Sequence, residues 1–288
     1  MLQPFRLEEP TSVAEASALL ARYGDSAKIY AGGTELLLVM KEGLLHYERL
    51  VNIKQLPDMA SVSMSDDAVR IGAAATHRTL EHSPLLQAHF PTLTRMEANV
   101  ANVRVREVGT LGGNLCFAEP HADPGTLLLV YNATVQLARQ GSNRTLPLDA
   151  FFIDSFEVAV EEDELMTAID VPKLPAHTAA AYRKFGFLER PSVGLAAAVT
   201  ATPDGVHEVR VAVGCVGPVP RRMPEVEALL SGKAITEARA QLETAGAMAG
   251  QAADAITDLH GSADYKAYLV GVLLRHAFDE AYEAALEA

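Results

Sequence analysis

Apolar residues recur at helical spacing in residues 11–23, where a threonine and a serine stand first and can cap a helix. Two short apolar runs follow, at residues 28–31 and 50–53, and runs of this length are typical of buried strands. Residues 36–41 lie between the two runs and predict a short helix. Together these segments predict a small lobe of strand, helix and strand within about the first 53 residues.

The next stretch of chain mixes predicted helices with predicted strands. Residues 79–90, which Pro84 interrupts, and residues 91–103 predict helices, and residues 125–131 form a further apolar segment. The sequence Pro172-Lys173-Leu174-Pro175 is the clearest linker in the chain. The strands predicted before this linker are residues 134–139, 144–148 and 165–171, and the pattern of the chain changes at residues 69–73.

Beyond the linker the pattern changes to two strands followed by helices. Residues 192–202 are a run of small apolar residues, and every second residue from Val209 to Cys215 is apolar, which places one face of that strand on a core. Residues 234–259 are rich in alanine and predict a helix, and Ser262 can cap a last helix. We therefore predict an α+β protein, whose 288 residues allow two or three lobes.

The composition excludes some classes of function but does not identify one. Hydrophobic residues make up 49% of the chain and charged residues 21%, which is typical of a globular protein. The net charge of −13 argues against binding to the phosphate backbone of nucleic acid, so we expect no nucleic-acid partner. Positive charge gathers locally at Arg104 and Arg106, where it could offset the charge of an anionic ligand.

The two cysteines, Cys116 and Cys215, are too few to hold a structural zinc ion or an iron–sulfur cluster. We expect Cys116 to be a buried thiol rather than a reactive thiolate. The N-terminal residues lack the pattern of a signal peptide, and no apolar run approaches the roughly 18 residues of a membrane helix. We therefore expect a soluble, cytoplasmic protein without a membrane span.

Two glycine pairs carry the clearest chemical signal, one within residues 30–35 and the other within residues 110–114. Glycine lets backbone N–H groups approach a ligand closely, and successive amides in a turn can surround an anionic oxygen. Neither segment has the spacing of a dinucleotide-binding fingerprint or of a Walker loop. Two such turns in one chain predict one long ligand with a diphosphate, held at two points, and ordinary tight turns are the alternative.

In the order and spacing of these motifs, the chain resembles the FAD-binding medium subunits of the molybdenum hydroxylases, the relatives of xanthine dehydrogenase and carbon monoxide dehydrogenase. Residues 31–36 are similar to the family's first diphosphate loop, and residues 106–114 are similar to its second. Residues 119–123, 182–191 and 261–266 are similar to later segments of the family, so the resemblance runs nearly from end to end.

The resemblance implies a fold of two parts. Residues 1–175 would form a two-lobed FAD-binding domain of the PCMH (vanillyl-alcohol-oxidase-like) type, with lobes at about 1–53 and 54–175. Residues 176–288 would form a smaller α+β domain of the carbon monoxide dehydrogenase flavoprotein C-terminal type.

The resemblance also implies the residues that bind FAD. The amides of residues 31–35 and 110–114 would bind the diphosphate, and Asp123 would hydrogen-bond the ribityl chain. Met166 and Lys184 would lie near the flavin ring, and Val100 would lie near the adenine. No catalytic residue and no metal ligand is expected in this chain. The expected FAD-binding residues are Ile29, Tyr30, Ala31, Gly32, Gly33, Thr34, Glu35, Leu36, Val100, Thr110, Leu111, Gly112, Gly113, Asn114, Asp123, Met166 and Lys184.

Several of these residues have an alternative role. Asp123 could instead cap the helix that begins after it, a role that Asp fills well. Lys184 could tune the flavin, because a nearby cation favours the anionic reduced form, or it could be an ordinary surface lysine. His121 is expected to be structural.

The function implied by the resemblance is electron transfer. Electrons would arrive from the [2Fe–2S] clusters of a small partner subunit, after substrate oxidation on a large molybdopterin subunit, and the FAD of this chain would deliver them to NAD, oxygen or another acceptor. The expected assembly is a dimer of heterotrimers. Two alternatives stay open, a self-sufficient flavin oxidase of related fold and a non-enzymatic nucleotide-binding scaffold.

Overall fold

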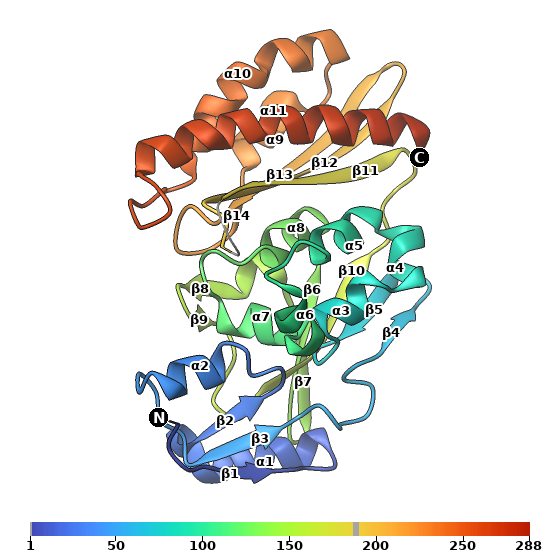
Figure 1. The fold of residues 1–288 in the computed structure, drawn as a ribbon. Helices are drawn as coiled ribbons and strands as arrows, with labels where there is room; N and C mark the ends of the chain where they lie inside the picture. Colours follow the sequence, from blue (N-terminus) through green and yellow to red (C-terminus); the bar gives the residue numbers. More distant parts are fainter. Residues whose placement is uncertain (1, 187–189) are drawn as a thin grey trace. The chain divides into compact units, whose positions relative to one another are not determined.

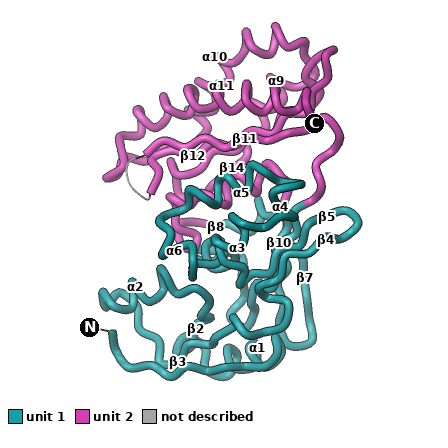
Figure 2. Tube along the Cα trace, turned by 45° about the vertical axis from the view of Figure 1, so that its right-hand side comes forward, with its two compact units in different colours: residues 1–117, 134–153, 157–171 teal, residues 118–133, 154–156, 172–288 magenta. Residues whose placement is uncertain are grey.

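The computed structural model describes residues 2–186 and 190–288, and its contacts divide them into two compact units (Figure 2). The N-terminal unit holds the residues up to Phe117 together with 134–153 and 157–171. The C-terminal unit holds residues 118–133, 154–156 and those from 172 onward. The chain therefore passes between the units several times, whereas the sequence predicts a single boundary at residue 175.

The first lobe of the N-terminal unit is the predicted strand–helix–strand lobe (Figure 1). Its three strands form a parallel sheet in the order β1-β3-β2, and the side chain of Ser12 caps its first helix by accepting a hydrogen bond from the Glu15 amide. The buried residues Ala16, Leu20 and Val51 lie in one core cluster between that helix and the sheet. The elements are β1 (Arg6–Glu8), α1 (Val13–Tyr23), η1 (Gly24–Ser26), β2 (Ala27–Tyr30), α2 (Leu36–Lys41) and β3 (Arg49–Asn52).

The second lobe of this unit is built on a five-stranded sheet with the strand order β4-β5-β10-β6-β7. Strands β6 and β7 pair as the predicted antiparallel hairpin. The strands are β4 (Val62–Met64), β5 (Ala68–Gly72), β6 (Thr134–Arg139), β7 (Ser142–Pro147) and β10 (Leu165–Pro172), and a separate pair is β8 (Phe152–Asp154) with β9 (Glu157–Val158). The helices are α3 (His77–Glu81), α4 (Pro84–His89), α5 (Pro91–Glu97), α6 (Val103–Val108), α7 (Leu111–Phe117) and the short η2 (Leu148–Ala150).

Two predictions about this lobe are wrong in their local detail. Residues 91–103 are not one helix, because α5 ends at Glu97 and α6 begins only at Val103. The turn between them contains Ala101 with φ of +41°, which a helix cannot include. The second glycine pair lies within the first turn of α7 and not in an irregular loop.

The C-terminal unit is a four-stranded antiparallel sheet, in the order β11-β12-β13-β14, with helices packed on it. Alternate residues of β12, such as Leu195 and Ala197, lie in the core cluster that contains α10 and α11 residues. The elements are α8 (Pro124–Val130), β11 (Thr178–Phe185), β12 (Val193–Thr202), β13 (Gly205–Gly214), β14 (Arg221–Arg222), α9 (Pro224–Leu230), α10 (Ile235–Ala252) and α11 (Ala263–Glu287).

Helix α8 is the apolar segment of residues 125–131, and it packs on β12 and β13. At Gly214 of β13 an added Cβ would collide with the Thr126 hydroxyl, so a glycine is required where this helix approaches the sheet. Every residue of α8 is buried. A helix apolar on all sides belongs inside a protein, and α8 is part of the interior of the C-terminal unit.

Candidate cofactor site

The first glycine pair lies where β2 ends and α2 begins. Gly33 has φ of +74°, a conformation that suits glycine, and an added Cβ there would collide with the Tyr30 ring. Within the described part of the chain, the amides of Gly32, Gly33 and Thr34 have no hydrogen-bond partner. Three successive free donors around a left-handed glycine form the concave arrangement that binds anionic oxygens.

The second glycine pair has a different role from the one predicted. The Leu111 amide donates to Ala75 O at 3.0 Å, and the Gly112 amide donates to Ala73 O at 2.9 Å. The Gly113 amide donates to Thr110 Oγ1 at 3.1 Å, and the Asn114 amide donates to Thr110 O at 2.9 Å. Four of the five amides expected to bind a diphosphate are therefore already bonded within the protein.

The two glycine segments nevertheless lie against each other. An added Cβ at Gly32 would collide with Val108 O, and one at Gly109 would lie 3.5 Å from Thr34 Oγ1. At Gly112 an added Cβ would lie 2.6 Å from Ala73 O. These glycines therefore allow backbone segments to approach one another, so the second segment supports the first at close range.

Two other predicted residues of the N-terminal unit lie around this pair of segments. Met166 is buried in β10 beside a bulge, and the carbonyl of its neighbour Thr167 accepts from the Ala73 amide at 3.0 Å. Because Ala73 also receives the Gly112 amide, β10 is connected to the second segment through one residue. Tyr30 ends β2, and the Lys54 ammonium lies 4.0 Å from the centre of its ring.

Asp123 and Lys184 belong to the C-terminal unit, where they contact each other. Lys184 Nζ donates to Asp123 Oδ2 at 2.9 Å, and Tyr182 OH donates to Asp123 Oδ1 at 2.7 Å. Burial, reinforced by the charge of Asp123, raises the pKa of Tyr182 well above its usual value, so this hydroxyl stays a donor. Asp123 occupies the N-cap position of α8, as the alternative predicts, but its side chain makes no capping hydrogen bond to that helix. Lys184 is an ion-paired lysine rather than an isolated surface one.

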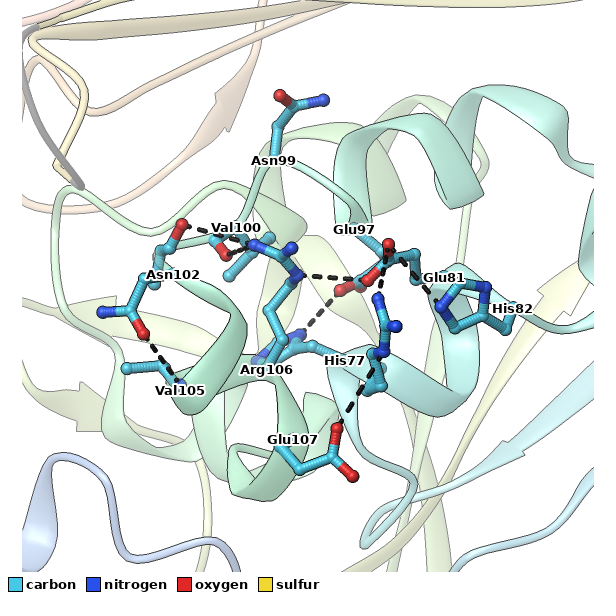
Figure 3. Close-up of polar contacts among 12 residues, drawn as sticks. His77, Glu81, His82, Glu97, Asn99, Val100, Asn102, Val105, Arg106 and Glu107 are labelled. Carbon is cyan, nitrogen blue, oxygen red and sulfur yellow. Dashed lines mark hydrogen bonds and ion pairs between the residues drawn. The ribbon is translucent and has the colours of Figure 1, made fainter.

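Arg106 is not the free charge that the sequence predicts. Figure 3 shows its guanidinium between α3 and the turn at Val100: Nε donates to Glu81 Oε2 at 3.1 Å, and Nη1 donates to Val100 O at 3.0 Å. Arg104 is exposed on the same helix. Of the two arginines, one is therefore neutralised inside the lobe and the other faces solvent.

The buried pair of His77 and Glu97 packs next to Gly109, just before the second segment. The sequence analysis did not predict this pair. His77 Nδ1 lies 2.6 Å from Glu97 Oε2, and the His77 amide donates to Gly109 O at 3.0 Å. An added Cβ at Gly109 would lie 3.3 Å from the His77 ring. Both side chains are almost fully buried. No spacing in the sequence indicates this pair, because the two residues come from different helices, α3 and α5.

His121 is held by two carboxylates, and Cys116 is only partly buried where the sequence predicts a buried thiol. His121 lies between Glu119 and Asp258, with 3.1 Å from each ring nitrogen to a carboxylate oxygen, and the buried Lys266 also binds Asp258. Burial raises the pKa of the Cys116 thiol to about 12, so it is not a thiolate at neutral pH. Within residues 2–186 and 190–288, no group of three His, Cys, Asp or Glu residues could hold a metal ion. No helix in these ranges is long and apolar enough to cross a membrane.

Comparison with known proteins shows the family of this chain. Residues 3–174 match the model of the FAD-binding domain in molybdopterin dehydrogenase, and residues 190–281 match the carbon monoxide dehydrogenase flavoprotein C-terminal domain. The chain is 32% identical to the carbon monoxide dehydrogenase medium chain of Hydrogenophaga pseudoflava, over 98% of this chain and 99% of that one. It is also 32% identical to the nicotine 6-hydroxylase medium subunit of Paenarthrobacter nicotinovorans, over 97% of this chain and 98% of that one.

Solved structures agree as well. A structure of carbon monoxide dehydrogenase from Hydrogenophaga pseudoflava superposes with a TM-score of 0.94 over 99% of both chains, at 32% identity. The expected α+β fold, with a flavoprotein C-terminal domain, is thereby confirmed. The chain belongs to the family of FAD-binding medium subunits of the molybdenum hydroxylases, which includes carbon monoxide dehydrogenase and xanthine dehydrogenase.

Proposed function

We propose that this chain carries FAD and passes electrons from the [2Fe–2S] clusters of a small partner subunit to NAD, oxygen or another acceptor. A large partner subunit would hold the molybdopterin and oxidise the substrate. The observation that carries the proposal is that the amides of Gly32, Gly33 and Thr34 have no hydrogen-bond partner among the described residues. FAD, when bound, supplies the electron-transfer chemistry.

The residues present fit a diphosphate at the first segment. The free amides can donate to its oxygens at the position that the left-handed Gly33 fixes. Lys54 adds a positive charge next to Tyr30, at the end of β2 that leads into these amides, in a chain whose net charge is −13. The remaining first-segment residues, Ile29, Ala31, Glu35 and Leu36, frame this turn.

For the second segment we propose a supporting role. Thr110, Leu111, Gly112, Gly113 and Asn114 stay in the proposed site because they directly follow Val108 and Gly109, which border Gly32 and Thr34. Their amides, apart from that of Thr110, hold α7 to the strand-end residues Ala73 and Ala75 or close its first turn. The segment would keep the first segment in place rather than donate many hydrogen bonds itself.

The other site residues keep the roles that the resemblance implies, as proposals. Asp123 would accept from a ribityl hydroxyl, and Met166 and Lys184 would lie near the flavin ring. Val100 would lie near the adenine. Because Lys184 is paired with Asp123, its effect on the flavin would be that of an ion pair and weaker than that of a lone cation.

The partner subunits, the assembly, the cellular location and the domain boundary are also proposals. The names of the relatives, medium chain and medium subunit, imply a small and a large partner, and we propose a dimer of such heterotrimers in the cytoplasm. We also propose residues 1–175 as the FAD-binding domain and residues 176–288 as the C-terminal domain, although the packing of the chain crosses that boundary.

The test is an absorbance spectrum of the purified chain, followed by acid treatment and chromatography of what is released. We expect flavin bands near ~450 nm and release of intact FAD. A colourless chain that also fails to take up added FAD would contradict the proposal and leave the scaffold alternative. Reduction of the flavin by an organic substrate, without partner subunits, would instead favour the self-sufficient oxidase.

A further inference from the structure

We propose that Arg106 is a positioning residue, which fixes the turn of residues 100–102 and thereby sets the affinity of the site for the adenylate half of its ligand. This inference rests on the proposed FAD site, and in particular on Val100 at the adenine end. It assigns a role to an arginine whose side chain binds Glu81 and the carbonyls of this turn.

The contacts of Arg106 connect this turn to α6, the helix that precedes the second glycine segment. Nη1 donates to Val100 O at 3.0 Å and to Ala101 O at 3.4 Å, so one nitrogen binds two successive carbonyls (Figure 3). The side chain is only 12% exposed. A buried arginine that binds successive carbonyls fixes the direction of the backbone that carries them.

The turn needs such support because its backbone is strained. Ala101 has φ of +41°, a left-handed conformation that a residue with a Cβ adopts only when its surroundings enforce it. Asn102 fixes the far side of the turn, since its side chain accepts from the amides of Arg104 at 2.9 Å and Val105 at 3.2 Å. Arg106 binds the carbonyls of Val100 and Ala101 on the other side, so the backbone is held on both sides of Ala101.

Glu81 holds the guanidinium in place. Its Oε2 accepts from Arg106 Nε at 3.1 Å, and its Oε1 accepts from Arg78 Nη1 at 2.9 Å. Burial raises the pKa of Glu81, but the hydrogen bonds from Arg78 and Arg106 outweigh burial and lower it overall. The carboxylate therefore stays charged at neutral pH, and the orientation of Arg106 is fixed from α3.

The same contacts argue against a simple electrostatic role. Arg106 and Arg78 share Glu81 at hydrogen-bond distance, and Glu107 lies 3.9 Å from Arg78. The charges of this cluster therefore balance, and little of the field of Arg106 is left for a ligand. Arg104, two residues earlier, is exposed and contacts neither carbonyl of the turn through its side chain within the described residues. It carries the same charge on the same helix and is the matched control.

The experiment measures the dissociation constants of FAD, ADP and FMN for the full-length apoprotein of Arg106→Lys, Arg106→Gln and Arg104→Gln. ADP probes the adenylate half and FMN the flavin half. We expect both Arg106 variants to bind FAD and ADP about tenfold or more weakly, since a hydrogen bond from a charged group is lost, and to bind FMN as before. Arg104→Gln should bind all three ligands like the unchanged protein.

Three results would overturn the inference. If Arg104→Gln weakened ADP binding as much as the Arg106 variants do, the positive charge of the helix and not the positioning of the turn would set the affinity. Loss of FMN binding in parallel with ADP binding would mean general damage to the lobe. Full ADP affinity in Arg106→Lys would mean that the planar guanidinium is not needed.

A second variant covers the case in which the Arg106 variants do not fold. Glu81→Gln keeps Arg106 but removes the charge that orients it, so ADP affinity should fall in the same direction by a smaller factor. Unchanged ADP affinity in a folded Glu81→Gln protein would overturn the inference. An unmodified chain that binds no FAD at all would instead contradict the proposed function, so the two failures are distinguishable.

Discussion

At the scale of single residues, neighbouring glycines in the first segment serve different purposes. Gly32 has an ordinary backbone conformation and is needed because Val108 O lies where its Cβ would be. Gly33 is needed both for its φ of +74° and for the nearby Tyr30 ring. Close packing of backbone on backbone, and not only approach to a ligand, therefore explains the pair.

A matched pair of glycine substitutions tests the role of Gly33. Gly33→Ala should abolish or strongly weaken FAD binding, because a Cβ there shifts Tyr30 and reorients the free amides. Gly43→Ala is the control, because Gly43 has φ of +77°, lies in the same lobe and has nothing within 4 Å of an added Cβ. Both changes cost about 1–2 kcal/mol of backbone strain. Equal flavin content in the two purified variants would contradict the role of Gly33.

A tyrosine substitution tests the buried carboxylate of the C-terminal unit. Tyr182→Phe removes the 2.7 Å hydrogen bond to the buried Asp123 Oδ1, and the loss of a hydrogen bond to a charged group costs about 1.5–3 kcal/mol. We expect that loss in the free energy of unfolding measured with urea. Tyr268→Phe removes an equivalent hydroxyl from a side chain that is 68% exposed and should change the same quantity by less than about 0.5 kcal/mol.

At the scale of elements, α7 shows what the sequence could and could not predict. The glycine pair was identified, and its closeness to the first segment follows from the geometry. Its helical conformation was missed, because two glycines at a helix start have low helix propensity and tertiary hydrogen bonds to Ala73 and Ala75 override it. The break between α5 and α6 was missed because the Arg106 side chain of α6 binds the carbonyls of Val100 and Ala101, a contact that hydrophobic spacing does not indicate.

The packing of α7 makes a prediction about Gly112. Gly112→Ala should destabilise the N-terminal unit by about 1–3 kcal/mol, because the new Cβ would lie 2.6 Å from both Ala73 Cβ and Ala73 O. Thermal unfolding with and without saturating FAD measures the effect. A variant as stable as the unchanged chain, with reduced FAD affinity, would show instead that Gly112 faces the diphosphate.

The pairing of β10 with its neighbours predicts a dependence of stability on pH. Arg70 hydrogen-bonds Asp170 of β10 at 2.8 Å and holds the pKa of that carboxyl below its usual range, with a further hydrogen bond from Gln136. A lowered pKa in the folded state means that the pair contributes stability above the unfolded pKa of about 3.9 and loses it as pH falls through the folded value.

The measurement is the midpoint of urea unfolding at neutral pH and at about pH 3. Asp170→Asn should unfold at a lower urea concentration than the unchanged chain at neutral pH. This gap between the two midpoints should shrink at about pH 3. Asp67→Asn, at an exposed position of the same sheet region, is the control and should show no such gap. A gap for Asp170→Asn that stays constant with pH would contradict the assignment.

At the scale of the whole molecule, the sequence predicted the fold class and the family, and the alternation of strands and helices predicted most elements. The interleaving of the two units was not predicted. Residues 118–133 precede the linker in sequence, yet α8 packs on β12 and β13 of the C-terminal unit. Its uniformly apolar residues indicated burial but could not indicate which partner would bury them.

That interleaving predicts the behaviour of a fragment. A chain ending at residue 175 leaves α8 without the sheet that covers Leu127 and Leu128, both 0% exposed in the full chain. We expect the fragment to aggregate or to bind a hydrophobic dye strongly, and co-expression with residues 176–288 to restore solubility. A soluble fragment that binds FAD like the full chain would contradict this expectation.

The position of α8 also has a consequence for synthesis on the ribosome. The helix ends at Val130, and the first strand that covers it after the linker, β12, begins at Val193, which is 193 − 130 = 63 residues later. At about 5–20 residues per second, that interval lasts roughly 3–13 seconds. For those seconds a mostly apolar helix is synthesised but lacks its sheet, so we expect this segment of the nascent chain to need protection by a chaperone.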